Sequence, residues 1–286
     1  MPELPEVETV VRDLRPLLVG RRVVRVSAGH QRLRQPWRPE WAARLKGRRF
    51  EAVTRRGKWI VLELDSGARL VVHLGMTGQL TVAAPGEAVL DHTHLVFGLD
   101  DKHELRYRDI RRFGGATLFA SSADVEAFFL DSGLGPEPFT LDPGVWCDAL
   151  AATSRQIKAV LLDQTVVAGV GNIYADEALF DAKLHPTRRA NELTRPEADR
   201  LRKAVASVLT YAIEKRGSTI RNYVGGSGLA GGYQDEFRAY GRRGEPCRRC
   251  RTPLEVLRVG GRASHYCPSC QPSAISCQQA GRPADS

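Results

Sequence analysis

The sequence has no long hydrophobic run and little that suggests export. No uncharged apolar stretch approaches the ~18 residues that a membrane-spanning helix requires. The opening residues, MPELPEVETV, carry glutamates where a secretory signal peptide has basic residues, and no apolar segment follows them. We therefore expect a cytoplasmic protein with no membrane partner, in which the six cysteines stay reduced instead of forming structural disulfides.

Acidic residues are in deficit. The 286 residues include 42 Lys and Arg but only 33 Asp and Glu, which gives a formal net charge of +9. An excess of this size favours a polyanionic partner, most simply nucleic acid. A basic protein with a merely solvated surface has the same composition, so the charge alone leaves both interpretations open.

The N-terminal segment has a helical pattern. Apolar residues recur at spacings of three and four over residues 5–18, and Pro5 suits the first turn of a helix. Glu6 and Glu8 suit the positive end of the helix dipole, so helix-start chemistry is one explanation for both acids. Glu3 lies before the helix and is not explained in this way.

Along the rest of the chain, the spacing of the apolar residues changes twice. Short runs rich in branched and aromatic residues, separated by turn signals, fill residues 21–120 and predict an antiparallel sandwich or barrel-like domain. The stretch DSGLGPEPFTLDPG is dense in Gly, Pro and Asp and is typical of a linker. Beyond it, residues 156–162, residues 173–182 and a segment that opens with the capping box TRPE have helical periodicity, with Gly217 at the place of a helix C-cap.

Four of the six cysteines form two C-x2-C pairs that are separated by sixteen residues. They are Cys247, Cys250, Cys267 and Cys270. This spacing is typical of a tetrahedral four-thiolate site, so we expect one structural Zn²⁺; two disulfides or four free thiols are the alternatives. Cys147 and Cys277 have no partner at ligand spacing, and we assign them no role.

The residues between the two cysteine pairs predict a hairpin. Two short strand-like runs flank Gly260-Gly261, which is a good two-residue turn. Arg262 is then at the tip, where a cation can enter a DNA groove. Four thiolates complete the metal shell, so His265 is expected to have a structural role.

The segment VVAGVGNIYADE places Gly169, Gly171 and Asn172 directly before a helix. Free backbone N–H groups and the helix dipole at such a start favour a phosphate. Asn172 is a suitable cap that can also donate to that phosphate. Tight packing is the usual explanation of a Gly-x-Gly pattern, and it stays open here.

Five motifs occur in order along the chain: MPELPEVET at the start, HLGMTG at 73–78, RRFGG at 111–115, GVGNIYADE at 169–177 and YGRRGEPCRRC at 240–250. Together they closely resemble the motifs of the bacterial formamidopyrimidine-DNA glycosylases, the base-excision enzymes for 8-oxoguanine and ring-opened purines. The resemblance runs from Met1 to about Gln271.

This resemblance implies an α+β fold. Its parts are an N-terminal antiparallel β-sandwich with an N-terminal helix, a helical domain with a helix–two-turn–helix motif, and a C-terminal zinc-finger β-hairpin. The expected boundaries are residues 1–130 for the catalytic sandwich domain, 131–148 for a linker, 149–240 for the helical DNA-binding domain, 241–271 for the zinc finger and 272–286 for a disordered tail.

The resemblance also implies a role for the N-terminus. In the family the initiator Met is removed and the amine of the exposed proline attacks C1′ of the damaged nucleoside, so Pro2 is the expected nucleophile. A terminal amine titrates near ~8 against ~10.4 for Lys, so more of it is unprotonated at neutral pH. A secondary amine gives an iminium with fixed positive charge, an electron sink for β,δ-elimination of the strand phosphates. Glu3 matches the family's general acid/base, and Glu6 is a candidate near the base pocket beside its helix-start explanation.

Lys58 stands in the strand-like run RRGKWIVLEL, and the sequence has only seven lysines. A desolvated lysine is a rival Schiff-base amine, but the resemblance implies a phosphate-contacting lysine that supports catalysis. By the same resemblance His73 and Asn172 contact phosphate, as does Arg262, which we group with the catalytic residues. Tyr240 is a further DNA-contact candidate, and such a cluster predicts a steep loss of affinity with salt.

To excise a base from a duplex, an enzyme must extrude the base and insert side chains into the space that the base leaves. Met76, Arg111 and Phe113 match the three residues that the family inserts. Phe113 wedges between base steps, and the flexible Met76 occupies the vacated space. Arg111 donates to O2 and N3 of the orphaned cytosine, which favours lesions opposite cytosine. Core positions for Met76 and Phe113 are the alternative.

The expected partner is double-stranded DNA with oxidised purine lesions, bound by a nucleoid-associated monomer. Residues 217–234 correspond to a loop that covers the flipped base in the family, and their extra glycines predict a looser loop.

Two other functions stay open. One is an endonuclease VIII-like glycosylase for oxidised pyrimidines with the same Pro–Glu chemistry. The other is a non-catalytic zinc-finger protein that binds damaged DNA, which gives no account of Pro2-Glu3.

Overall fold

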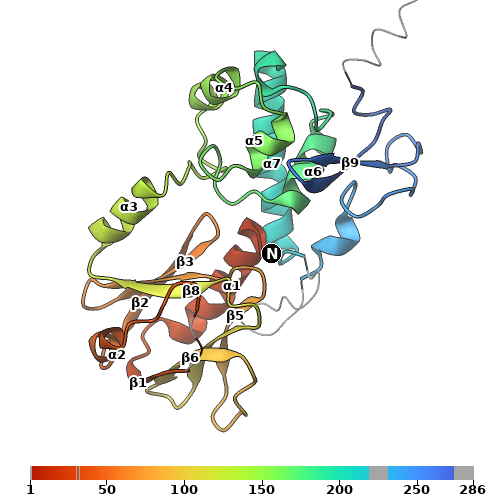
Figure 1. Cartoon of the computed structure of the whole chain (residues 1–286). Helices are drawn as coiled ribbons and strands as arrows, with labels where there is room; N and C mark the ends of the chain where they lie inside the picture. Colours follow the sequence, from red (N-terminus) through yellow and green to blue (C-terminus); the bar gives the residue numbers. More distant parts are fainter. Residues whose placement is uncertain (1, 30, 32, 219–230, 274–286) are drawn as a thin grey trace, which may run out of the picture. The chain divides into compact units, whose positions relative to one another are not determined.

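The computed structural model describes residues 2–29, 31, 33–218 and 231–273 of the chain (Figure 1). Within these ranges, every helix is too short or too polar to span a bilayer. The predictions of a loose loop and of a disordered tail fall mostly on residues 219–230 and 274–286, which lie outside the described residues.

The chain divides into two compact units. The N-terminal unit comprises Met1–Gly133 and Ala212–Gln234, and the C-terminal unit comprises Leu134–Tyr211 and Asp235–Ser286. The segment 212–234 therefore groups with the sandwich, whereas the sequence predicted it as part of a helical domain.

The N-terminal unit is a β-sandwich with one long helix, α1 (Leu4–Leu18) (Figure 1). One antiparallel sheet has the strand order β1-β6-β7-β5 and the other has the order β2-β3-β4-β8. The strands are β1 (Val23–Ala28), β2 (Phe50–Arg56), β3 (Trp59–Leu64), β4 (Arg69–His73), β5 (Gly78–Ala83), β6 (Thr93–Leu99), β7 (Glu104–Asp109) and β8 (Gly115–Phe119). Apolar side chains of α1 and of both sheets share one buried core, so the predicted sandwich is confirmed.

The helix α1 buries one apolar side. Its residues at spacings of three and four, Val7, Val10, Val11, Leu14 and Leu18, are at most 1% exposed. This is the amphipathic pattern that the sequence predicted over residues 5–18. Since the stripe packs on the sandwich, the chain's N-terminus is attached to the core by the first helix.

The C-terminal unit combines helices with a small hairpin (Figure 1). Its elements are α4 (Pro143–Ala151), α5 (Ile157–Leu162), α6 (Asn172–Asp181), the 3-10 turn η1 (Ala190–Glu192), α7 (Arg195–Glu214), whose last residues belong to the N-terminal unit, and the strands β9 (Glu255–Val259) and β10 (Arg262–Tyr266). A second short 3-10 turn, η2 (Tyr233–Glu236), lies where the chain passes between the units. The predicted helices at 156–162 and 173–182 and the predicted hairpin are confirmed.

Capping chemistry explains the ends of α7. The N–H of Thr194 donates to Glu197 Oε2 over 2.9 Å, and the N–H of Glu197 points back to Thr194 Oγ1 over 3.4 Å, as a capping box requires. At the other end Gly217 has φ +71°, and its N–H donates to the carbonyl of Ala212 over 2.7 Å. Arg216, with φ +63°, is the left-handed residue that directly follows the helix, and its N–H donates to the Ile213 carbonyl over 3.0 Å. Both residues close the helix, and the predicted glycine of the C-cap lies one position further along the chain than the first left-handed residue.

The prediction of a linker over 131–148 was partly wrong, because α4 begins at Pro143. The Asp142 carboxylate accepts from the N–H groups of Gly144 and Val145, so this Asp-Pro pair starts a helix instead of a loop. The short helices α2 (Glu40–Leu45) and α3 (Ser122–Asp131) were not predicted.

Candidate active site and metal centre

The N-terminus is buried and held in place. Pro2 is buried, and Glu3 is only 3% exposed. Glu3 occupies the N-cap of α1 in an extended conformation, and its N–H donates to Glu6 Oε2 over 2.8 Å. The positive end of the helix dipole therefore adjoins Pro2 and Glu3. A terminus of this kind has a fixed position, in contrast to the frayed ends of most chains.

The carboxylate of Glu6 has structural partners. Its Oε1 accepts from the N–H of Ser218 over 2.8 Å and from the Ser218 hydroxyl over 3.0 Å, while Oε2 accepts from Glu3. Glu6 is 2% exposed and joins the start of α1 to the segment after α7, inside the N-terminal unit. These contacts favour the helix-start explanation of Glu6, and a DNA contact by Glu6 stays a prediction.

Lys58 lies in the turn between β2 and β3, so the prediction that it is a strand residue was wrong. Gly57 has φ +56°, which allows the tight reversal, and Lys58 is 7% exposed. Trp59, the next residue, pairs with His73 across β3 and β4. The structure therefore brings Lys58 and His73 to the same end of one sheet.

His73 is a neutral hydrogen-bond donor. Burial, together with the positive charges of Lys58 and Arg34, lowers the pKa of His73 to about 4. The N–H of Gly75 donates to Nδ1 of His73 over 3.1 Å, so the proton of the neutral ring is on Nε2. Arg34 was missed in the sequence, because nothing local in the run QRLRQPW marks a cation that lies near His73.

We expect the His73 ring to titrate near pH 4, which histidine ring chemical shifts against pH will measure. Since the folded pKa is below the unfolded value of 6.5, His73 stabilises the fold fully above pH 6.5, and this contribution is lost as the pH falls toward 4. The size is at most about 3 kcal/mol. A His73→Gln variant should lose less stability over this pH range. A midpoint at 6.5 or above would contradict the assignment.

The three residues that the sequence predicted for insertion are at the surface. Met76 and Phe113 are each 43% exposed, which excludes the alternative that they are core residues. Arg111 lies over the ring of Phe113 with its Cζ atom 4.5 Å from the ring centroid, a cation–π contact. All three follow the ends of strands in the N-terminal unit, with Met76 just after β4 and the other two after β7.

In the C-terminal unit, Asn172 is the first residue of α6, and Gly171 is the N-cap. The prediction that Asn172 is the cap was therefore wrong. Its Nδ2 donates instead to the carbonyl of Ala263 in β10 over 3.1 Å. This contact places Asn172 beside the hairpin that begins with Arg262.

A buried ion pair connects the same hairpin to the helices. Lys158 Nζ is 2.6 Å from Asp176 Oδ1, and neither side chain is exposed. Lys158 also donates to the Ala263 carbonyl over 2.7 Å, and His265 donates its N–H to Asp176 Oδ2 over 2.9 Å. The structural role expected for His265 is in keeping with this contact. Lys158 and Asp176 were missed, although Lys158 is one of only seven lysines.

Tyr240 lies at the start of the zinc-finger segment. Its N–H donates to Glu177 Oε1 over 2.8 Å, and Glu177 also accepts from the N–H groups of residues 238 and 239. Burial raises the pKa of Glu177. The Tyr240 ring contacts the rings of Phe237 and His265. These contacts fix Tyr240 in the unit, and its DNA contact stays a prediction.

The four cysteines form a site of the right size for zinc. Their Sγ atoms lie within 4.8 Å of one another, with 3.4 Å between Cys250 and Cys267 and 3.9 Å between Cys247 and Cys270. Thiolates at ~2.3 Å from a tetrahedral Zn²⁺ are about 3.8 Å apart, whereas a disulfide requires ~2.05 Å. The donor set and its dimensions therefore fit one structural Zn²⁺ and exclude the disulfide alternative. Cys147 is half-buried and lies outside this cluster.

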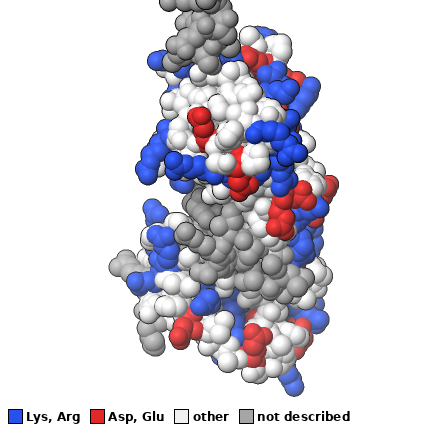
Figure 2. Space-filling view, turned by 90° about the vertical axis from the view of Figure 1, so that its right-hand side faces the viewer, with Lys and Arg blue, Asp and Glu red and all other residues white. Residues whose placement is uncertain are grey.

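The distribution of charged side chains on the surface is in keeping with the net positive charge of the chain (Figure 2). On the face drawn in Figure 2, Lys and Arg side chains are spread widely, with Asp and Glu side chains between them.

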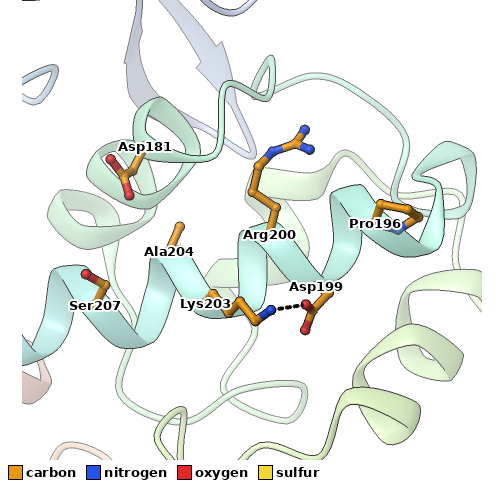
Figure 3. A pocket seen from close by; sticks show the side chains of 7 residues that line it. All are labelled: Asp181, Pro196, Asp199, Arg200, Lys203, Ala204 and Ser207. Carbon is orange, nitrogen blue, oxygen red and sulfur yellow. Dashed lines mark ion pairs between the residues drawn. The ribbon is translucent and has the colours of Figure 1, made fainter.

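An open groove of about 550 Å³ lies along α7 (Figure 3). Its lining includes an ion pair between Lys203 and Asp199 (2.7 Å), and Arg200 is already bonded to the Ala182 carbonyl. None of the predicted site residues lines this groove, so we assign it no role.

The β-sandwich, the helical unit and the four-cysteine finger are the three parts that the sequence motifs implied for a zinc-finger DNA glycosylase. Three family models match in succession: "Formamidopyrimidine-DNA glycosylase N-terminal domain" over residues 1–116, "Formamidopyrimidine-DNA glycosylase H2TH domain" over 134–224, and "Zinc finger found in FPG and IleRS" over 244–272. The chain belongs to the formamidopyrimidine-DNA glycosylase family and is an enzyme of base-excision repair.

Relatives and solved structures match over nearly the whole length. The formamidopyrimidine-DNA glycosylase of Herpetosiphon aurantiacus is 48% identical over 277 residues, which covers 95% of this chain and 100% of the relative. The enzyme of Thermomicrobium roseum is 45% identical over 291 residues, which covers 95% and 99%. A wild-type Lactococcus lactis Fpg bound to DNA with N7-benzyl-Fapy-dG is 36% identical, with a TM-score of 0.89 and coverage of 95% and 100%. MutM with DNA that contains carbocyclic 8-oxo-G has the same identity and coverage and a TM-score of 0.88.

Proposed function

We propose that the protein excises 8-oxoguanine opposite cytosine, and formamidopyrimidines, from double-stranded DNA and then cleaves the abasic site by β,δ-elimination. The observation that carries this proposal is the buried Pro2-Glu3 pair at the start of α1. The damaged bases in this proposal are taken from the names of the relatives and from the modified bases in the DNA of the similar structures.

The chemistry begins with the amine of Pro2 after removal of Met1. The nitrogen forms a bond to C1′ of the damaged nucleoside while the bond from C1′ to the base breaks. The departing base keeps the electron pair of that bond and takes up the proton that the Pro2 nitrogen loses. Glu3 then protonates the sugar ring oxygen as the bond between C1′ and this oxygen breaks, so a cationic iminium links Pro2 to C1′. The iminium withdraws electrons during the two eliminations that release the strand phosphates, and Glu3 carries protons between steps.

The exposed residues after β4 and β7 act on the duplex. Phe113 enters between base steps, Met76 takes the space of the extruded base, and Arg111 donates to O2 and N3 of the orphaned cytosine. The exposure of Met76 and Phe113 supports these roles, because a buried side chain cannot enter the base stack.

Phosphate contacts are proposed in each unit. In the N-terminal unit, Lys58 offers a charge and His73 offers its Nε2–H. In the C-terminal unit, Asn172 and Arg262 lie at the start of α6 and of β10, with Tyr240 as a further contact. When the four cysteines hold Zn²⁺, the metal supplies no chemistry to the reaction and keeps the hairpin of Arg262 folded.

Borohydride trapping tests the proposal. The protein is incubated with a duplex that contains 8-oxoguanine opposite cytosine, and in parallel with one that contains an oxidised pyrimidine. Borohydride reduces an iminium to a stable amine, so we expect a covalent band on the first duplex that maps to Pro2 by peptide mass spectrometry. A stronger band on the second duplex would support the endonuclease VIII-like alternative. No band on either, with zinc bound and DNA bound tightly, would overturn the enzymatic mechanism.

A further inference from the structure

Two neighbouring turns carry the side chains proposed to enter the duplex. The first, residues 74–77, joins β4 to β5 and carries Met76; we call it the Met76 turn. The second, residues 110–114, joins β7 to β8 and carries Arg111 and Phe113; we call it the Phe113 loop. They are more than thirty positions apart in the sequence, and what holds them together decides whether their side chains reach the DNA together.

The backbones of the two turns are in direct contact. A Cβ atom on Gly75 would lie 2.5 Å from the nitrogen of Gly114 and 2.7 Å from the carbonyl carbon of Phe113. A Cβ atom on Gly114 would lie 2.2 Å from the carbonyl oxygen of His73. Any side chain at either glycine would push the turns apart, so both positions require glycine.

One buried carboxylate bonds to both turns. Asp109 ends β7 and is 0% exposed. Its Oδ1 accepts from the Thr77 hydroxyl over 2.5 Å and from the N–H of Arg111 over 3.2 Å. Its Oδ2 accepts from the N–H of Gly114 over 2.9 Å and from the Tyr107 hydroxyl over 3.3 Å. The N–H of Arg111 also lies 3.0 Å from Thr77 Oγ1, which closes a small network between the Met76 turn and the Phe113 loop.

This arrangement requires an acceptor with two oxygens. Four donors converge on Asp109, and an ionised carboxylate has four lone-pair sites for them. Burial and the nearby Asp109 raise the pKa of Tyr107, so its hydroxyl stays a donor. An asparagine would turn an NH₂ group toward the N–H of Arg111 on one side or the N–H of Gly114 on the other, so the Phe113 loop would lose one of its two bonds to this side chain.

We propose that Asp109 and Thr77 are positioning residues that join the Met76 turn and the Phe113 loop into one preassembled wedge. Asp109 is buried and acts only through the residues that it holds. The wedge then enters the base stack without first ordering two separate turns, so extrusion of the base is faster. This inference rests on the proposed function.

The test uses a matched pair, Thr77→Val and Thr77→Ser. Valine keeps the shape of threonine but has no hydroxyl, whereas serine keeps the hydroxyl. We expect Thr77→Val to slow single-turnover excision of 8-oxoguanine by about tenfold and Thr77→Ser to stay within about twofold of the wild type. On a duplex with a preformed abasic site, where no base has to leave the stack, both variants should cleave at the wild-type rate.

A fluorescence measurement distinguishes a positioning role of Thr77 and Asp109 from a general loss of protein stability in the variants. With 2-aminopurine beside the lesion, unstacking raises the signal, and we expect this phase to slow in Thr77→Val and in Asp109→Asn but not in Thr77→Ser. Equal slowing on the lesion and abasic duplexes, or equal behaviour of the Val and Ser variants, would overturn the inference. If Asp109→Asn does not fold, the Thr77 pair decides alone. If the wild-type protein excises neither lesion, the proposed function fails instead, whatever the variants do.

Discussion

Attaching a permanent tag in front of Pro2 is expected to lower excision of 8-oxoguanine by at least about 10³-fold, because it removes the proposed nucleophile. An amide nitrogen has no available lone pair, so no iminium forms and borohydride traps no protein. The proposed first step needs a free amine at Pro2, which is buried beside Glu3 at the start of α1. Single-turnover cleavage of the lesion duplex measures the loss.

The matched control carries the same tag at the other end of the chain. It should excise and trap at the wild-type rate, and both tagged proteins should keep duplex binding and zinc. A Glu3→Gln variant keeps the amine but cannot transfer protons, so its rate should fall by about 10²- to 10⁴-fold. Full activity of the N-terminally tagged protein, with mass spectrometry showing the tag intact, would exclude Pro2 as the nucleophile and return Lys58 as the candidate amine.

Replacing one zinc ligand is expected to remove the metal and most of the DNA affinity. In Cys267→Ser we expect the zinc content to fall from one per chain to nearly none, because structural sites of this kind depend on all four ligands. Cys267 is not exposed, and it precedes Gln271, whose side chain accepts from the N–H of Cys267 over 2.9 Å. Loss of the metal frees the hairpin β9–β10 and so displaces Arg262. We expect duplex affinity to fall by at least about tenfold, measured by fluorescence anisotropy.

The control for this prediction is Cys147→Ser, since Cys147 is half-buried and outside the four-cysteine cluster. It should keep both zinc and affinity. The thermal transition of the sandwich should persist in Cys267→Ser, because that core is built from α1 and the two sheets. A Cys267→Ser protein that still holds one zinc, or that loses zinc without losing affinity, would contradict the proposed role of the finger.

Elements that depend on neighbours in the sequence were predicted closely. The helical pattern at residues 5–18 corresponds to α1, and the Gly260-Gly261 turn has positive φ at both residues, as its hairpin requires. The helix α3 was missed although Ser121 caps it locally, since its Oγ accepts from the N–H of Asp124 over 3.2 Å; the rest of its support is tertiary. Its Phe128 and Phe129 pack against Trp59 of β3, with ring centroids 5.4 and 6.1 Å apart.

The candidate site was predicted in part. The motifs named Pro2, Glu3 and the four cysteines, and the dimensions of the cysteine cluster fit the expected Zn²⁺. They gave no sign of Asp109 or Lys158, whose importance comes from their partners. Lys158 bonds to the Ala263 carbonyl, 105 positions away, and Asp109 bonds to Thr77, 32 positions away.

By itself, the sequence determined the family, the zinc ligands and the positions of the main helices, because thiol spacing and helix caps act between residues a few positions apart. Only the tertiary structure decided that Met76 and Phe113 are exposed, that burial and two nearby cations keep His73 neutral, and that one carboxylate joins two distant turns. Burial and hydrogen-bond partners come from segments far apart along the chain, and no local pattern encodes them.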